Sequence, residues 1–327
     1  MVARKTEGCV YGPPVQGKAM AETKQMIIGD CSHLPFSRAE AVRLRVLGEE
    51  VETKLPFDPS HPEKVFLRSL AGRPILDWPV ALPPRDPRGV ESAETFECWK
   101  NASASKVGIA GSYFSFKAGG RTALHSHLEA RLLRYFEMCP FVAEIRTQYP
   151  AWDREKYLWC SERGNRMRKS DVMTVDFMLT LQIPGHPFRV YHGVSGKPAA
   201  LVGNEKVVSR HGREEDTLWK WRCTHEVMTE ETIGEIEFSN YRRLFALMLH
   251  VEDIGAHAPA AEQLAHVLYE TNARGSLNRV LGMVAKRLGW SLAHGYLLFG
   301  IGHFLGYLRW DHRFLLARRL PMMLNKR

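Results

Sequence analysis

The sequence predicts an α/β fold in which a small mixed sheet is flanked by helices and is followed by a mostly helical region. Between residues 112 and 236, segments with the two-residue alternation of strands take turns with segments of helical period. Their order is a helix, three strands, a helix and a strand, which favours a single sheet covered by helices. After residue 236 the period becomes helical.

Composition places the chain among globular proteins of about two ordinary domains, because 327 residues can bury a sizeable core. The net charge of +9 suits a polyanionic partner such as nucleic acid, and it is also common in proteins without one. The six cysteines form no CxxC pair, and no apolar signal segment opens the chain. We therefore expect reduced thiols, a cytoplasmic location and no membrane partner.

Proline divides the chain, since residues 1–90 hold eleven of the eighteen prolines. Such a segment is mostly extended or irregular, with one helix expected over 37–52. It could wrap the core, form a partner-binding arm or be partly disordered. We predict an N-terminal extension over 1–90, a sheet-containing domain over 91–236 and a C-terminal domain over 237–327.

The elements of the middle domain follow from local pattern. SYFSF and the turn KAGGRT favour a hairpin, and the linker QIPGHP returns the chain as an antiparallel neighbour of the strand before it. A polar basic loop, SERGNRMRKSD, is expected at 161–171. In order we expect a hairpin (112–122), a helix (126–138), strands (141–152, 172–181 and 188–197), a helix (205–221) and a strand (222–229).

The C-terminal domain is predicted to be winged-helix-like. Helical periods cover 239–253, 258–272 and 276–290, and two short strands are expected between 305 and 320. Three helices followed by a hairpin is the order of a winged helix, although a plain helical domain shares most of these signals. The apolar stretch 292–310 contains two histidines and four glycines, so we predict a buried helix and then a strand rather than a membrane span.

Glu129 is the first candidate functional residue, because it lies inside the apolar stripe of the helix predicted at 126–138. A carboxylate there must meet a cation, a metal or water, since burial without a partner is costly. A salt-bridged core glutamate or a solvent-exposed stripe edge would also explain it. So would an S-x-x-E capping box with Ser126.

Asp176 and Lys197 form the second candidate pair. Aspartate is disfavoured inside strands, yet Asp176 stands in the middle of VMTVDFMLTL. An exposed sheet face or a backbone hydrogen bond could account for it. Lys197 ends the next strand, which Pro198 stops, and antiparallel pairing could set it beside Asp176. Ser195 lies two residues before Lys197 and, by alternation, on the same face.

Together these residues predict metal-dependent cleavage of a phosphodiester. Carboxylates supply the hard oxygen ligands that Mg²⁺ prefers. The metal lowers the pKa of a bound water and offsets charge on the phosphate, while a nearby lysine stabilises the developing negative charge. A zinc cluster at His125 and His127 is an alternative, but no distant histidine or cysteine pair in the sequence completes a tetrahedral site.

Five segments follow one another in a distinctive order and spacing: SHLEARLLRYFE, VAEIRTQYP, VMTVDF, VSGKPAAL and CTHEVMTEETI. In these segments, over roughly residues 112–236, the sequence resembles the TnsA endonuclease subunit of heteromeric, Tn-seven-like transposases. The resemblance implies a restriction-endonuclease-like core that uses Mg²⁺, with Mn²⁺ as a substitute. It also implies cleavage of one strand at transposon ends for cut-and-paste transposition.

Residue by residue, the resemblance implies that Glu129 and Asp176 are the catalytic acids and that Lys197 is the catalytic lysine. The family normally has Gln-x-Lys where this chain has Ser195-Gly196-Lys197. Ser195 and the Gly196 carbonyl are therefore expected to complete the metal ligands, with reduced metal affinity, because a hydroxyl is a shorter and weaker ligand.

The resemblance also implies three partners, which are transposon-end DNA, a DDE-type transposase and an AAA+ regulatory ATPase. The basic C-terminal segment suits phosphate contact, although a solvated basic tail is the alternative. The DNA-binding residues expected there are Arg309, Arg313, Arg318 and Arg319. Two other functions remain open: a catalytically weakened DNA-binding or scaffold subunit, suggested by Ser195, and a stand-alone DNA-processing nuclease on the same core.

Overall fold

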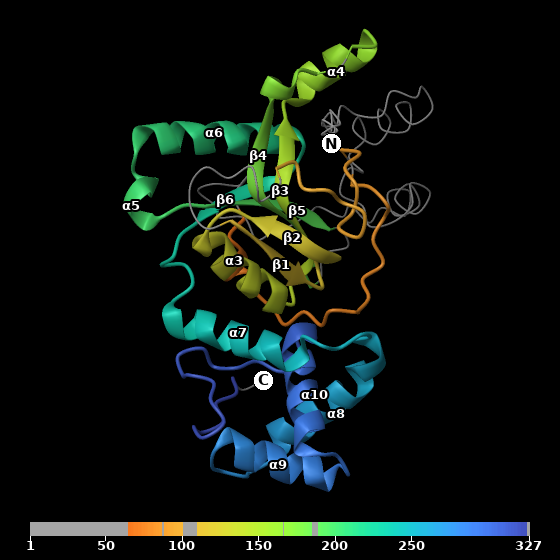
Figure 1. Cartoon of the computed structure of the whole chain (residues 1–327), viewed down its shortest axis with the longest axis vertical. Coiled ribbons are helices and arrows are strands. Elements are labelled where there is room, and N and C mark those ends of the chain that lie inside the picture. The colour runs from red at the N-terminus through yellow and green to blue at the C-terminus, as the bar shows by residue number, and fades with distance from the viewer. Residues whose placement is uncertain (1–64, 87, 101–109, 166, 185–188, 326–327) are drawn as a thin grey trace, which may run out of the picture.

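The structure is a computed structural model that describes residues 65–86, 88–100, 110–165, 167–184 and 189–325. The helix expected over 37–52 lies outside these residues. The chain has a mixed α/β fold, with a mixed sheet flanked by helices in one part and a group of helices in the other (Figure 1). The predicted α/β class is therefore confirmed.

The sheet has four strands in the order β3-β4-β5-β6. These strands are β3 (Val142–Trp152), β4 (Val172–Leu181), β5 (Val190–Gly196) and β6 (Thr224–Met228). The first three are antiparallel in sequence, as the short linker after 181 predicts, and β6 is parallel to β5. A parallel neighbour needs a crossover, which α5 (Ala199–Val202) and α6 (Glu205–Lys220) provide.

Two helices cover opposite faces of this sheet, α3 (His127–Met138) and α6. Successive residues of β4 show the alternation, because Met178 packs in one cluster with Leu218 of α6, whereas Leu179 packs in another with Leu132 of α3. Strand β5 therefore has an α3 face and an α6 face, and both carry polar side chains near its C-terminal end.

The hairpin β1 (Gly111–Ser115) and β2 (Gly120–Leu124) forms as predicted. Its turn contains Gly119 and Gly120 at φ of 68° and 137°, the left-handed region that glycine adopts most readily. Lys117 of the same turn is buried, and its Nζ donates to the carbonyls of Phe136 and Cys139, 3.2 and 2.7 Å away. The turn thus satisfies carbonyls at the C-terminal end of α3.

Between β3 and β4 the chain forms a helix that the sequence did not suggest, α4 (Arg154–Glu162), followed by the 3-10 turn η3 (Lys169–Asp171). The helix has no clear apolar stripe, which explains why its period was not recognised. The expected basic loop at 161–171 is correspondingly shorter.

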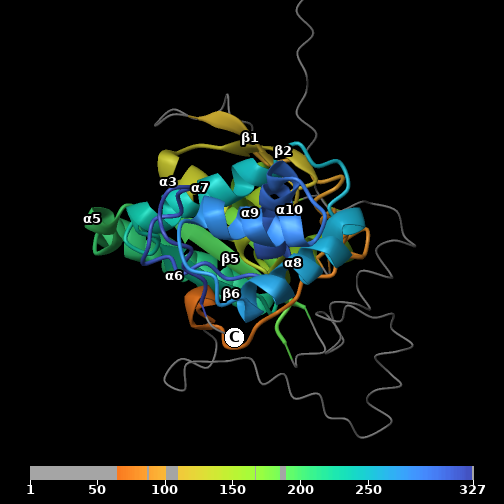
Figure 2. The ribbon, with the colours of Figure 1, turned by 90° about the horizontal axis from the view of Figure 1, so that it is seen from below.

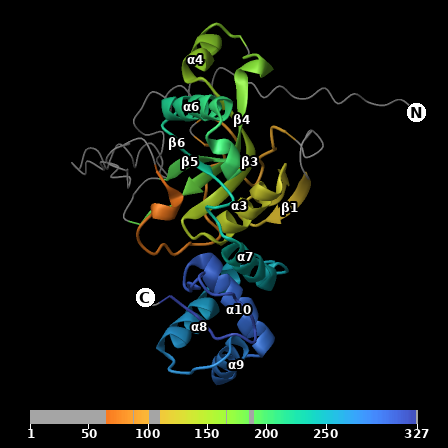
Figure 3. The same ribbon diagram turned by 90° about the vertical axis from the view of Figure 1, so that its left-hand side faces the viewer.

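A helical lobe follows the sheet, defined here as α7–α10 (Figure 3). Its helices are α7 (Glu235–Met248), α8 (Ala258–Glu270), α9 (Leu277–Arg287) and α10 (Leu292–Leu305), with the 3-10 turn η4 (Gly255–His257) before α8. The helices predicted at 239–253, 258–272 and 276–290 are confirmed, as is the buried helix after 292. Figure 2 looks along the molecule from the helical lobe, with α9 over α10.

The two strands expected between 305 and 320 do not form, and this prediction was wrong. Trp310 instead makes an isolated bridge with Leu324, and Ser276 makes one with Pro321. The backbone N–H of Asp311 donates to Met323 over 2.9 Å, so the segment pairs with the end of the chain rather than with its nearest neighbour. The described C-terminal part is thus four helices closed by an irregular segment.

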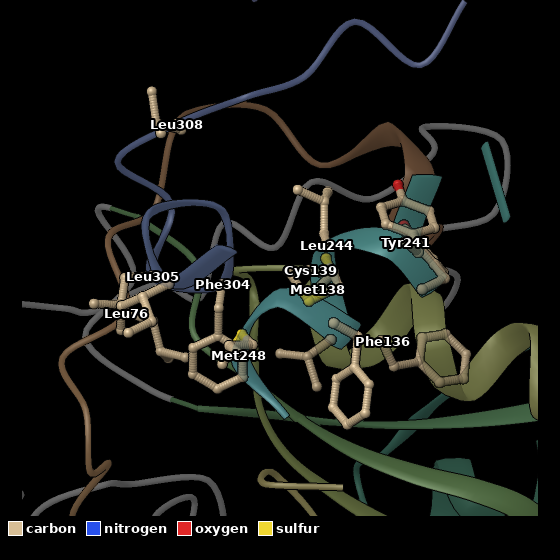
Figure 4. Packing of buried hydrophobic residues seen from close by; sticks show 14 of the residues in the cluster. Leu76, Phe136, Met138, Cys139, Tyr241, Leu244, Met248, Phe304, Leu305 and Leu308 are labelled. Atoms are coloured by element: carbon tan, nitrogen blue, oxygen red, sulfur yellow. The ribbon is translucent and has the colours of Figure 1, made fainter. Parts of the chain in front are cut away.

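Residues 65–86 run along the core, which is one of the three possibilities left open for the N-terminal extension. They include the 3-10 turn η1 (Leu67–Ser69). The backbone N–H of Leu76 donates to the carbonyl of Leu305 over 2.8 Å, and Leu76 is buried beside Leu305 and Phe304 (Figure 4). Leu67 is also buried, and its N–H donates to Oε1 of Glu226 in β6 over 3.1 Å. This segment therefore contacts both the sheet and the helical lobe.

A buried ionic network fastens the next part of the segment to β3. Oδ2 of Asp86 contacts Arg88 at 2.6 Å, Arg146 at 2.9 Å and the hydroxyl of Tyr149 at 2.6 Å. Burial opposes the charge of Asp86, but the two arginines outweigh it and lower the pKa of this carboxyl. These charges are paired, as buried charges must be.

Within the described residues, no helix is both long enough and apolar enough to cross a bilayer.

Candidate active site

Glu129 lies in the first turn of α3 with its side chain buried. Ser126 is the N-cap, and its Oγ accepts from the backbone N–H of Glu129 over 3.1 Å. In return, Oε2 of Glu129 accepts from the N–H of His125 over 2.9 Å. The expected capping interaction is therefore present, although its return bond goes to the residue before the cap.

The Glu129 carboxylate makes further hydrogen bonds besides these capping bonds. Oε2 also accepts from Nε2 of Gln148 over 3.1 Å, and Ser126 Oγ donates to Oε1 over 3.0 Å. Gln148 belongs to β3, where its φ of 48° marks a left-handed residue inside a strand. The sequence did not single out Gln148, because a glutamine in a strand carries no signal of this backbone conformation.

Asp176 meets the end of β5 as antiparallel pairing predicted. Its Oδ2 accepts from the backbone N–H of Gly196 over 2.9 Å, and Nζ of Lys197 lies 3.6 Å from the same oxygen. The side chains of Asp176 and Lys197 are 13% and 21% exposed, so the pair is reachable from solvent. Gly196 itself contacts the site through its N–H.

The two acids influence one another. Burial raises the pKa of Glu129, and the negative charge of Asp176 raises it further. Two carboxylates in one neighbourhood, with a lysine beside one of them, carry more negative than positive charge. A divalent cation held by oxygen would offset that excess, so these residues fit Mg²⁺ in their donor type.

Ser195 has different partners. Its buried Oγ donates to Oε2 of Glu214 over 2.8 Å and lies 3.2 Å from Nε2 of His225. The neighbouring Gly196 faces the other way, since a Cβ on it would lie 3.2 Å from Leu132 of α3. The structure thus pairs Asp176 with Lys197, and Glu129 is near enough for the charge of Asp176 to raise its pKa. It puts the Ser195 hydroxyl on the α6 face of β5.

That α6 face holds a second polar cluster, which we call the His-Glu-His cluster and define as His211, Glu214 and His225. Nδ1 of His211 lies 3.0 Å and Nε2 of His225 lies 3.6 Å from Oε2 of Glu214. Arg210 donates through Nε to the other oxygen, Oε1, over 2.8 Å. Burial alone would raise the pKa of Glu214, but the His211 hydrogen bond and the Arg210 charge outweigh it and lower this pKa to about 2.

The four C-terminal arginines expected to bind DNA are all exposed, and two of them already have partners. The guanidinium of Arg313 pairs with Asp311 over 2.6 Å, and that of Arg318 lies 5.0 Å from the ring centre of Tyr296. Arg309 and Arg313 line a pocket of about 550 Å³ between the helical lobe and residues 67–74. Arg319 is exposed on the same irregular segment.

Comparison of the chain with protein-family models gives no match, and neither does comparison with curated protein sequences.

Proposed function

We propose that the chain is a metal-dependent DNA endonuclease of the TnsA type, which cleaves a strand at transposon ends with a DDE-type transposase and an AAA+ ATPase. The observation that carries this proposal is the meeting of Asp176 with Lys197 and Gly196, next to Glu129. The element order of the sheet domain, a helix, three strands, a helix and a strand, is compatible with the restriction-endonuclease-like core that the resemblance implies.

In this proposal Glu129 and Asp176 hold Mg²⁺, with Mn²⁺ as a substitute, and the metal supplies an activated water and charge stabilisation. Gln148 fixes the orientation of Glu129 through its amide, and the N–H of Gly196 fixes that of Asp176. Lys197 lies where it can stabilise negative charge that develops on the scissile phosphate. The Gly196 N–H and the Lys197 ammonium both contact the same oxygen of Asp176, Oδ2.

Partner DNA is proposed to contact the basic C-terminal segment, which includes Arg309, Arg313, Arg318 and Arg319. Phosphate binding by these arginines would make DNA association weaken as salt rises. Arg313 must release or share Asp311 to take part, so Arg309 and Arg319 are the stronger candidates. The winged-helix-like description of this domain is part of the same proposal.

A nicking assay tests the proposal. It uses supercoiled transposon-end DNA, the partner transposase and Mg²⁺ or Mn²⁺, and it compares Asp176→Asn with Asp216→Asn, an exposed aspartate of α6. We expect Asp176→Asn to lose at least about 100-fold in cleavage rate and Asp216→Asn to keep it. Equal cleavage by both variants would show that Asp176 is not catalytic.

The same assay separates the alternatives. A parent chain that binds transposon ends without cutting them would indicate the weakened scaffold subunit. Cutting that needs neither the transposase nor transposon ends would indicate a stand-alone nuclease.

A further inference from the structure

The His-Glu-His cluster lies on the opposite face of β5 from Asp176 and Lys197, and the proposed nuclease chemistry does not use it. Helix α6 supplies His211 and Glu214, which are three residues apart and so share one helix face. Strand β6 supplies His225, whose side chain points from the sheet toward α6. All three side chains are at least nine-tenths buried.

The spacing of the donor atoms suits a single small metal ion. One nitrogen from each histidine and one carboxylate oxygen all lie within 4.8 Å of one another. A tetrahedral ion with bonds of about 2.0–2.1 Å separates neighbouring ligand atoms by roughly 3.4 Å. The distances of 3.0 and 3.6 Å from Glu214 Oε2 to the two histidine nitrogens lie on either side of that value.

Ser195 supplies a fourth oxygen at the same place. Its Oγ lies 2.8 Å from Glu214 Oε2 and 3.2 Å from His225 Nε2, so it is within reach of two of the three donor atoms. A serine hydroxyl is a weak ligand, and it can hold a metal-bound water there instead. The residue that departs from the expected Gln-x-Lys pattern is thus the one that faces this cluster.

The chemistry of the donors identifies the class of metal. Two imidazole nitrogens and one carboxylate suit zinc and its transition-metal neighbours, whereas Mg²⁺ prefers oxygen ligands alone. Arg210 pairs with the outer oxygen of Glu214 and leaves Oε2 directed at the two histidines. It is therefore placed to orient this ligand from outside the metal's own shell.

A hydrogen-bonded network without a metal is the competing explanation, because Glu214 can accept bonds from Ser195 and His211. Nε2 of His211 is buried without a hydrogen-bond partner in the described part of the chain, with or without a metal on Nδ1, so it does not decide between the two explanations. The observation that favours a metal is the convergence of His211 and His225 on one oxygen of Glu214.

We propose that His211, Glu214 and His225 bind one zinc-class divalent ion, with the Ser195 hydroxyl or a water as the fourth ligand. The ion joins α6 to β6 across the end of β5. Ser195 immediately precedes Gly196, whose N–H holds Asp176 in place, so the ion also steadies the strand end that the proposed nuclease site uses. This site is separate from the Mg²⁺ site proposed at Glu129 and Asp176.

The test measures metal binding alone, so its result does not depend on whether the chain cleaves DNA. The untagged full chain is stripped with a chelator and titrated with Zn²⁺ against a chromophoric competitor in excess Mg²⁺. We expect one Zn²⁺ per chain in the parent. Glu214→Gln and His225→Gln should each weaken binding by at least about 10- to 100-fold. Asp216→Asn, which changes an exposed aspartate of the same helix α6, is the matched control and should bind as the parent does.

Two further readouts keep the test decisive if a variant fails to fold. Zn²⁺ should raise the thermal unfolding midpoint of the parent, because a ligand that binds only the folded state stabilises it. Anomalous diffraction at the zinc edge should give one peak among His211, Glu214 and His225. Absence of stoichiometric Zn²⁺ in the parent, a peak at Asp176, or equal affinity in folded Glu214→Gln would each overturn the proposal.

Discussion

The two faces of β5 carry acids in opposite electrostatic situations. On the α3 face, burial and a second carboxylate raise the pKa of Glu129, and the partly exposed Lys197 lies beside that second carboxylate, Asp176. On the α6 face, His211 and Arg210 lower the pKa of the equally buried Glu214 to about 2. The comparison shows that burial alone does not decide how an acid behaves, since the neighbours reverse its effect.

The difference also separates the two kinds of metal that we propose. The α3 face offers the carboxylate oxygens of Glu129 and Asp176, which are the donors that Mg²⁺ prefers. The α6 face has two histidines and an arginine around its carboxylate, so its donors include nitrogen as well as oxygen. Nitrogen donors suit a metal of the zinc class rather than Mg²⁺.

The largest effect is expected from Lys197→Ala, which removes the ammonium group that lies 3.6 Å from Oδ2 of Asp176. Cleavage should fall by at least about 100-fold, because the developing charge on the phosphate loses its stabilising partner. Association with DNA should stay nearly intact. Lys206→Ala, an exposed lysine at the start of α6, is the control in a nicking assay paired with a binding assay. Loss of folding in Lys197→Ala would show that this lysine is structural.

The second effect concerns Glu214→Gln and the stability of the protein in acid. The low folded-state pKa of Glu214 stabilises the protein above the ordinary carboxyl pKa, and this contribution is lost as pH falls toward about 2. Substitution should therefore cost roughly 3 kcal/mol at neutral pH and flatten the acid limb of the stability curve. Urea unfolding at a series of pH values measures both the loss at neutral pH and the slope in acid. If the variant lost stability in acid as steeply as the parent, the proposed effect of His211 and Arg210 on Glu214 would be contradicted.

The matched change Glu129→Gln should give a pH dependence of the opposite sign. Because the folded-state pKa of Glu129 is raised, the parent loses stability as pH rises from the ordinary carboxyl pKa through the raised value. The glutamine variant should lack this loss and be no less stable than the parent near neutral pH, while cleavage is lost. The same urea titration compares both variants. If the two substitutions changed the pH dependence of the free energy of unfolding in the same direction, the difference between the two faces would be contradicted.

The smallest effect is expected from Ser195→Ala, which removes one hydrogen bond to Glu214 and leaves the α3 face unchanged. Stability should fall by about 1 kcal/mol. If Ser195 acted instead as a Mg²⁺ ligand with Asp176, the Mg²⁺ concentration needed for half-maximal cleavage would rise. A metal titration of the nicking rate decides between these roles.

Most of the sheet domain could be predicted from sequence, because alternation and helical period are local signals. The meeting of Asp176 with Lys197 also followed from the short linker between their strands, which sets antiparallel pairing. What alternation did not reveal was that Ser195 and Lys197 have separate partners. Lys197 lies beyond the last residue of β5, so the alternation of side chains along the strand no longer determines which way it points.

The His-Glu-His cluster could not be predicted, because His211 and His225 belong to different elements whose packing is a tertiary property. One signal was available, since His211 and Glu214 share a face of a helix that precedes a strand with a buried histidine. The prediction of two strands between 305 and 320 was wrong for a similar reason. Trp310 pairs with Leu324, which lies further along the chain than a tight hairpin reaches.

The backbone bond between Leu76 and Leu305 joins the beginning and the end of the described chain. Contacts of such sequence separation slow folding, because the loop between them must close before they contribute. During synthesis α10 emerges late, so Phe304 and Leu305, which lie beside Leu76, are absent until most of the chain has left the ribosome. A chain interrupted before α10 therefore leaves this apolar segment partly uncovered and open to aggregation.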